Sequence, residues 1–209
     1  MDMDIIQEAL TFDDVTLAPN YSQILPSEVN TSSQLSKNLS LTIPLLTSAM
    51  DTVTESKMAL AMAELGGIGV IHRNLTIDNQ IKEIQKVKEK KYLVGAAVGA
   101  SPQEHKRAEK ILKENLDLIV VDTAHGHTKK VADIIKKIKK IKPKKTTLCA
   151  GNIATAEAAK FLIKLGVDII KVGIGPGSIC TTRLVAGIGV PQLSAILNVK
   201  KGMGNSKCT

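Results

Sequence analysis

The sequence predicts an α/β protein, a (β/α)8 TIM barrel that is incomplete here, with about six βα units present. Its short β-branched segments are apolar along their whole length, which is typical of parallel strands covered on both faces. They alternate with amphipathic helical segments, and each strand-and-helix unit takes about 25 residues. Polar residues follow the strands directly, as they do where the strands of a barrel converge on one rim.

Six strands are expected, each bounded by turn residues. They cover Leu41–Ala49, Gly67–Arg73, Tyr92–Gly99, Leu116–Ala124, Thr146–Asn152 and Val167–Gly175. Helices are expected to begin near Thr54, Asp78, Pro102, Thr128, Thr155 and Gln192. Eight units are needed to close such a barrel. We therefore expect residues 1–209 to form one catalytic barrel domain that is incomplete at its C-terminal end, or that receives its last part from another chain.

Composition narrows the class of protein. The formal charge of +8 comes largely from lysines, many of them opposite the apolar stripe of a helix over residues 129–145, and we interpret them as a solvated outer face. Aromatic residues make up 2% of the chain, which leaves little to stack on bases and makes nucleic acid an improbable partner. No apolar run is long enough for a membrane span. Three distant cysteines argue against a disulfide framework and favour a cytoplasmic location.

The stretch GIGPGSICTTR, from Gly173 to Arg183, combines three alternating glycines with a single cysteine. Backbone without side chains lets N–H groups converge on an anion or carbonyl groups on a cation. A cysteine in a positive environment forms a thiolate, which is a strong nucleophile. The loop could therefore hold a phosphate beside a reactive thiol, or Cys180 could be an inert side chain in a glycine-rich turn.

Beyond this pattern, the stretch VGIGPGSICTTRLVAGIGVPQLSAI over residues 172–196 closely resembles the catalytic loop of the IMP dehydrogenase family. The segments TFDDVTLAP near the N-terminus, Ile43–Thr76, and VDTAHGHTKKV over residues 121–131 resemble other parts of that family. GMP reductase shares the GPGS-x-CTTR core. The segment LVAGIGVPQ after Arg183, however, favours the dehydrogenase.

The resemblance implies oxidation of IMP to XMP with NAD, potassium as a second cofactor, and a homotetramer. It implies Cys180 as the nucleophile that attacks the purine C2 and Thr182 as a residue that assists water activation. It further implies substrate binding by Ser48, Met50, Asn152 and Ser178; cofactor binding by Asp122, Thr123, Ala124, Gly173, Ile174 and Gly175; and a potassium site at Gly175, Gly177, Cys180 and Arg183.

Some of these residues have simpler interpretations. Asp122 could cap a helix, Met50 could fill the core, and Ser48 and Asn152 could satisfy loop backbone. At the level of the whole chain, the alternatives are a GMP reductase that consumes NADPH, and an inactive nucleotide-binding fragment that needs a partner chain.

The chain also departs from the family in two ways. Residues 80–99 run on without the regulatory insert that the family carries at this point. The family's later motifs are also missing, because the tail NVKKGMGNSKCT over residues 198–209 does not resemble the family. Without the last units, sheet edges and apolar surface stay open, so we expect the isolated chain to be unstable or inactive.

Overall fold

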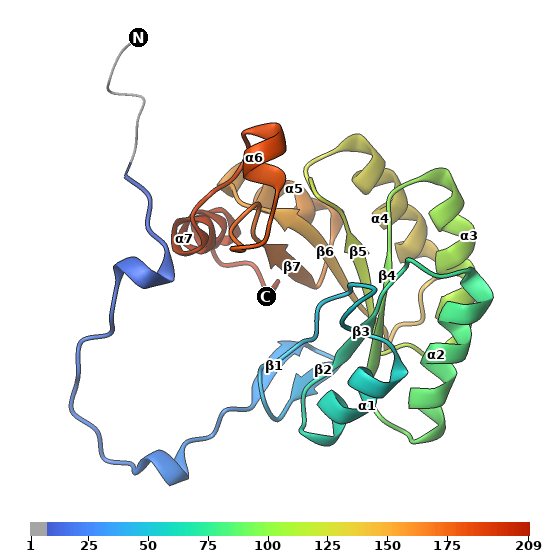
Figure 1. Cartoon of the computed structure of the whole chain (residues 1–209), viewed down its shortest axis with the longest axis horizontal. Coiled ribbons are helices and arrows are strands. Elements are labelled where there is room, and N and C mark those ends of the chain that lie inside the picture. The colour runs from blue at the N-terminus through green and yellow to red at the C-terminus, as the bar shows by residue number, and fades with distance from the viewer. Residues whose placement is uncertain (1–7) are drawn as a thin grey trace.

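The computed structural model describes residues 8–209 and contains a five-stranded parallel sheet (Figure 1). Its strands follow one another in space in the same order as in the sequence. They are β3 (Gly69–Ile71), β4 (Val94–Val98), β5 (Leu118–Asp122), β6 (Thr147–Ile153) and β7 (Ile169–Val172). Four of these strands lie within an expected range, and β6 extends one residue beyond its range, to Ile153. The α/β class with alternating strands and helices is confirmed, and the sheet does not close into a barrel within the described residues.

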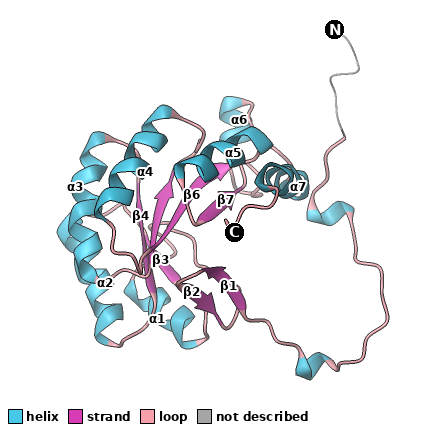
Figure 2. Cartoon of the chain, turned by 180° about the vertical axis from the view of Figure 1, so that it is seen from behind, coloured by secondary structure: helices cyan, strands magenta, loops and turns pink. Residues whose placement is uncertain are grey.

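Helices cover the outer face of the curved sheet, as the two ribbon views show (Figures 1 and 2). They are α1 (Ser56–Glu64), α2 (Ile77–Glu89), α3 (Pro102–Ile111), α4 (Lys129–Ile141) and α5 (Ala156–Leu165). Beyond β7 lie a short helix, α6 (Thr182–Ala186), and a longer one, α7 (Gln192–Met203). Short 3-10 turns occur at Phe12–Asp14, Pro26–Glu28 and Leu112–Glu114. The expected helix starts are confirmed to within about two residues, the ordinary uncertainty of a helix boundary.

Threonine side chains start three of the helices. Thr76, Thr128 and Thr155 each accept a hydrogen bond from the backbone N–H three residues later, at 3.2, 3.3 and 3.2 Å. This bond satisfies one of the N–H groups that a helix leaves without a partner at its first turn. At the other end of α5, Gly166 takes a left-handed conformation with φ of 76°. The sequence therefore marks both ends of α5 correctly.

The expected strand over Leu41–Ala49 is wrong in its extent. Leu41, its first residue, pairs antiparallel with Ser33. Beyond Leu41 only Leu46 pairs, in an isolated parallel bridge with Ile68, where the N–H of Thr47 donates to the carbonyl of Ile68 at 3.1 Å. Pro44 has no N–H to give to a ladder, which is the physical reason why pairing does not extend through this segment.

A two-stranded antiparallel hairpin precedes this segment and was not expected. It is formed by β1 (Ser33–Ser36) and β2 (Leu39–Leu41). The structure thus has five regular parallel strands plus one bridged segment, where the sequence predicted about six βα units. The segment around Leu46 stands beside β3, where the first unit belongs.

Two layers of core lie on opposite faces of the sheet. Successive side chains of β5 alternate between them: Ile119 and Val121 pack against the helices, whereas Leu118 and Val120 face the concave side. On the concave side, Leu39 and Leu41 of the hairpin close the core. This two-sided burial explains why the strands are apolar along their whole length.

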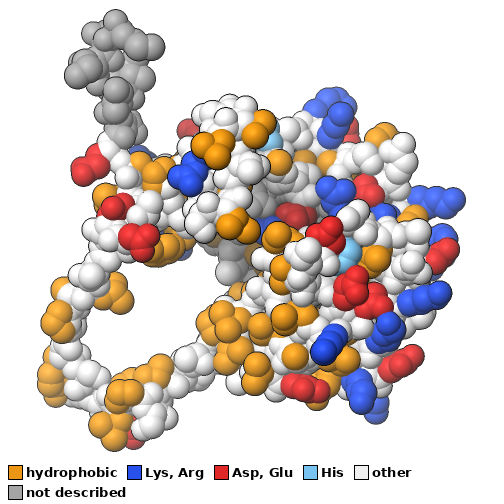
Figure 3. All heavy atoms as spheres, viewed as in Figure 1, with side chains coloured by type: hydrophobic (Ala, Val, Ile, Leu, Met, Phe, Trp, Pro, Cys, Tyr) orange, Lys and Arg blue, Asp and Glu red, His pale blue; other side chains and the backbone are white. Residues whose placement is uncertain are grey.

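Each edge strand of the sheet pairs with a single further residue, Leu46 beside β3 and Thr209 beside β7. Beside β7, the N–H of Ile170 donates to the carbonyl of Thr209 at 2.8 Å, and the N–H of Thr209 donates to the carbonyl of Asp168 at 3.0 Å. Residues 11–31 form an arm that meets the body at its 3-10 turn, stands away from the body after that turn, and carries exposed apolar side chains (Figure 3). Among the described residues, no helix is long and apolar enough to cross a membrane.

Candidate active site

A cavity of about 350 Å³ lies at the carboxyl ends of the parallel strands. It is lined by residues from the ends of β3, β5, β6 and β7 and from the glycine-rich loop after β7, the place where α/β proteins built on parallel strands bind their ligands. The lining residues are Arg73, Asp122, Thr123, Ala124, Asn152, Lys171, Gly173, Ile174, Gly175, Pro176, Gly177, Cys180 and Thr182.

Cys180 is the cysteine that lines this cavity. Its Sγ lies 3.3 Å from Oγ1 of Thr182, within hydrogen-bond distance for sulfur. Hydrogen bonds from the side chain and backbone of Thr182 stabilise the thiolate and lower the pKa of Cys180 below its usual value, and the charge of Arg183 acts in the same direction. A lowered pKa gives a larger fraction of reactive thiolate near neutral pH.

The first turn of the glycine-rich loop is fixed by Asn152. Its Nδ2 donates to the carbonyl of Gly173 at 2.8 Å, and the N–H of Gly173 donates to the carbonyl of Ile153 at 2.9 Å. Gly175 then has a φ of +68°, a conformation that a side chain would strain. Asn152 thus satisfies loop backbone, as its simpler interpretation expects, and it also lines the cavity.

Asp122 stands at the end of β5 and forms an ion pair across the sheet. Its Oδ1 accepts a hydrogen bond from Nζ of Lys171 on β7 at 2.7 Å. The neighbouring Thr123 donates through its hydroxyl to the carbonyl of Gly151 at 2.8 Å, which extends the contact between β5 and β6 beyond the ladder. Asp122 therefore lies in the cavity and caps no helix, because α4 is capped by Thr128.

Four of the predicted site residues lie outside the lining of this cavity. Ser48 and Met50 belong to the loop before α1, where Met50 is 47% exposed and fills no core. Ser178 is exposed at the tip of the glycine-rich loop. Arg183 instead lines a neighbouring hollow of about 340 Å³, where the 3-10 turn of the arm meets the segment before α7.

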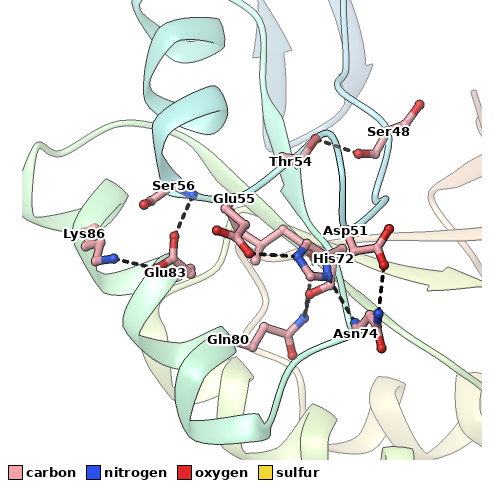
Figure 4. Close-up of polar contacts among 11 residues, drawn as sticks. Ser48, Asp51, Thr54, Glu55, Ser56, His72, Asn74, Gln80, Glu83 and Lys86 are labelled. Carbon is pink, nitrogen blue, oxygen red and sulfur yellow. Dashed lines mark hydrogen bonds and ion pairs between the residues drawn. The ribbon is translucent and has the colours of Figure 1, made fainter.

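The loop that carries Ser48 is held against the end of β3 by polar contacts (Figure 4). The hydroxyl of Thr54 donates to the carbonyl of Ser48 at 2.6 Å. Buried His72 lies with Nε2 3.2 Å from Oε1 of Glu55, and its Nδ1 accepts from the N–H of Asn74 at 3.1 Å. This network fixes the loop through its backbone and leaves the Ser48 side chain exposed.

The donor set for potassium is partly in place. Among the described residues, no backbone hydrogen bond is recorded to the carbonyls of Gly175 and Cys180, whereas the carbonyl of Gly177 accepts from the N–H of Cys180 at 3.1 Å. The carbonyl of Arg183 accepts from the N–H of Gly187 at the end of α6. Neutral carbonyl oxygens are the ligands that bind potassium in protein filters, so the free carbonyls of this loop fit such an ion.

Lys171 lines the cavity but is absent from the sequence-based set of site residues. The available signal was a single charged residue inside the apolar strand VDIIKVGIG. Lysine is rarely buried in a parallel strand unless it is paired, and such a residue at a strand end points to a site. Arg73, at the end of β3, is a second cavity-lining cation outside that set.

Comparison with known proteins places the chain in a family. A profile described as the IMP dehydrogenase / GMP reductase domain matches residues 9–208. An inosine-5′-monophosphate dehydrogenase of Borreliella burgdorferi is 45% identical over 97% of this chain, and one of Cryptosporidium parvum is 44% identical over 91%. Another of Staphylococcus aureus is 35% identical over 91%.

The chain spans 62%, 58% and 65% of the lengths of these three relatives. The profile nevertheless takes in nearly the whole described chain, including every strand of the sheet and the cysteine loop. The chain belongs to the IMP dehydrogenase / GMP reductase family.

Proposed function

We propose that this chain forms the catalytic part of an IMP dehydrogenase, which oxidises IMP to XMP with NAD. The observation that carries the proposal is Cys180: its thiol, with a lowered pKa, shares one cavity with Thr182 and with Asp122 and Asn152 from neighbouring strand ends. The relatives that resemble the chain over almost its full length are named for this activity. Residues 1–209 are assigned to one catalytic barrel domain without a regulatory insert.

In the proposed reaction the thiolate of Cys180 adds to C2 of the purine, which then loses its hydride to the acceptor that bound NAD would supply. Water then adds to C2, the C–S bond breaks, and one proton is released, which gives XMP and restores the thiolate. Thr182 stands next to the sulfur, at 3.3 Å, and its hydroxyl can pass a proton from the attacking water. The covalent intermediate divides a difficult oxidation into two easier steps.

The other cavity residues are assigned to binding and orienting the substrate and the cofactor. Asp122, Thr123, Ala124, Gly173, Ile174 and Gly175 line the part assigned to the cofactor, NAD, which accepts the hydride when bound. Asn152 holds the loop, and Ser178 with the N–H groups around it is assigned to the substrate phosphate, with Ser48 and Met50 brought in by the loop before α1. Carbonyls of Gly175, Gly177 and Cys180, near Arg183, are assigned to potassium. Assembly into a homotetramer and a cytoplasmic location belong to the same proposal.

The nucleophile can be tested without hydride transfer. We expect Cys180 to form an adduct with an IMP analogue that carries chlorine at C2, because the thiolate displaces chloride at the same carbon. The adduct is the same covalent intermediate that water hydrolyses in the proposed reaction, so rapid quenching with acid is used to trap it. Mass spectrometry would locate one adduct on Cys180, which Cys180→Ala removes and Cys208→Ala retains. An adduct that survives Cys180→Ala would contradict the assignment.

Measurements of turnover distinguish a dehydrogenase from a reductase and from an inactive fragment. We expect NADH to form from IMP and NAD, and Cys180→Ala to abolish this formation. Consumption of NADPH with GMP and release of ammonia would instead identify a reductase. Alkylation of Cys180 without turnover would identify a nucleotide-binding fragment that needs a companion chain.

A further inference from the structure

Asp122, Gly151 and Lys171 form one row across three neighbouring strands. Asp122 pairs in register with Gly151, and Gly151 pairs with Lys171. All three positions are on the concave face of the sheet. Side chains two residues apart in a strand share a face, and Val120, Cys149 and Ile169, which lie two residues earlier, belong to the concave core. Asp122 and Lys171 are therefore separated by a whole strand, on the face that leads into the cavity.

The ion pair crosses that strand because its middle residue has no side chain. A Cβ placed on Gly151 would lie 2.7 Å from Cβ of Lys171 and 2.3 Å from its backbone carbonyl oxygen. Neighbouring strands lie about 4.8 Å apart, so Asp122 and Lys171 are about 10 Å apart at their backbones. The extended lysine side chain spans this distance only by passing over Gly151, and it reaches Oδ1 of Asp122 at 2.7 Å.

The ammonium group of Lys171 orients the carboxylate of Asp122. Both side chains line the cavity, where 25% of the Asp122 side chain and 39% of the Lys171 side chain are exposed. A charge-assisted hydrogen bond to Oδ1 fixes the rotation of the carboxylate about its own bond. Among the described residues, no hydrogen bond is recorded to Oδ2, which is left for a donor that enters the cavity.

We propose that Lys171 is a positioning residue for Asp122: by reaching across Gly151 it holds one carboxylate oxygen and turns the other toward a hydroxyl donor of the bound cofactor, such as a ribose diol. This inference rests on the proposed function, in which Asp122 holds a ribose. Lys171 acts through Asp122, since its ammonium group is engaged by the carboxylate. Gly151 is the residue that permits the arrangement.

Binding of NAD to the full chain tests the proposal. Loss of a charge-assisted hydrogen bond is expected to weaken binding about ten-fold in Asp122→Asn and in Lys171→Met. Lys171→Arg, which keeps the charge, should recover most of the affinity, whereas a residue with a merely structural role would tolerate methionine as well as arginine. Because Lys171 acts through Asp122, the double variant Asp122→Asn/Lys171→Met should bind as Asp122→Asn does.

The matched control is Lys164→Met, which removes an exposed lysine on α5 and should leave NAD binding unchanged. Parent-like binding by Lys171→Met, or a further loss in the double variant, would overturn the proposal.

A second measurement needs no cofactor. Ion-paired lysine ammonium groups exchange slowly enough to be seen in proton–nitrogen correlation spectra, and we expect a Lys171 signal that disappears in Asp122→Asn and in Gly151→Val. A Lys171 signal unchanged by Asp122→Asn would overturn the positioning role. If the Lys171 signal is lost in Asp122→Asn but the parent chain does not bind NAD, the positioning role of Lys171 stands. The assigned cofactor site is then contradicted instead.

Discussion

The three cysteines carry the same side chain, and the fold places them in surroundings that shift their pKa values in opposite directions. Cys149 is in the concave core with 5% of its surface exposed, and burial raises its pKa to about 12. Burial also raises the pKa of Cys208, to about 11. Cys180 stands on a loop at the cavity, where the hydrogen bonds from Thr182 lower its pKa. Residue type alone does not distinguish them, since buried thiols are inert and exposed, stabilised thiolates react.

The variant Thr182→Val tests this residue-scale contrast. It keeps the shape of the side chain and removes the hydroxyl that stabilises the thiolate, so the pKa of Cys180 should rise. Because the thiolate is the reacting form, the pH profile of alkylation by iodoacetamide should move to higher pH, and the rate near neutral pH should fall several-fold. Cys149 in the same sample serves as an internal control and should stay unmodified until the chain unfolds. A pH profile of Cys180 that does not move in Thr182→Val would contradict the hydrogen bond as the cause.

At the scale of the elements, helix boundaries follow local chemistry, whereas the spacing between helices follows packing. Thr155 and Gly166 mark the two ends of α5 through their own side chain and backbone. Gly202 on α7 has a different role. A Cβ there would lie 2.3 Å from the carbonyl oxygen of Ala156, so glycine lets α7 approach the first turn of α5 closely.

The N-cap of α5 gives an element-scale prediction. Replacing Thr155 by alanine removes the acceptor for the N–H of Ala158 and should lower the free energy of unfolding by about 1 kcal/mol. The matched control is Ser101→Ala at the start of α3, where the serine makes no side-chain cap hydrogen bond and the loss should be near zero. Urea denaturation followed by circular dichroism measures both, and equal losses would contradict the assigned cap.

Gly202→Ala tests the contact between α5 and α7, because the sign of its effect on the free energy of unfolding depends on how closely the two helices approach. Helix propensity alone would make alanine more stable by about 1 kcal/mol. The collision with the backbone of Ala156 should outweigh this gain and leave the variant less stable, within the range of about 1–3 kcal/mol that overpacking costs. Lys201→Ala, on the exposed side of the same helix, should change the stability little. A stabilised Gly202→Ala would show that the two helices do not approach so closely.

At the scale of the whole molecule, the sheet is an open part of a barrel. Each edge strand is paired at one point, Leu46 beside β3 and Thr209 beside β7. Apolar side chains also stand exposed on the arm and on α6, among them Leu17 at 98%, Tyr21 at 83% and Leu184 at 87%. Open edges and contiguous apolar surface favour association with other chains.

We therefore expect the purified chain to associate as its concentration rises. Sedimentation velocity over about a hundred-fold range of concentration should show a shift from smaller to larger species, because association follows mass action. Replacing Leu17, Tyr21 and Leu25 on the arm by serine should move this shift to higher concentration. A single monomeric species over the whole range would show that the exposed surface and open edges do not drive association.

The order of strands and helices was predictable because each depends on local pattern: apolar runs for strands, threonine caps and apolar stripes for helices. The same holds for the cysteine loop, whose glycines and thiol are adjacent in the sequence. The segment Leu41–Ala49 was mispredicted because its apolar residues outweighed Pro44, whose missing N–H limits pairing. Lys171 was overlooked because its partner lies 49 residues away, on another strand.

The sequence by itself determined the α/β class and the capped helices, since these depend on neighbours along the chain, and it predicted Cys180 as the reactive thiol. Tertiary structure alone decided that Asp122 and Lys171 meet across Gly151, and that Cys180 opens on their cavity while Cys149 is buried beneath it. The physical reason is the register between strands: it puts residues far apart in the chain into one row, and no local pattern encodes it.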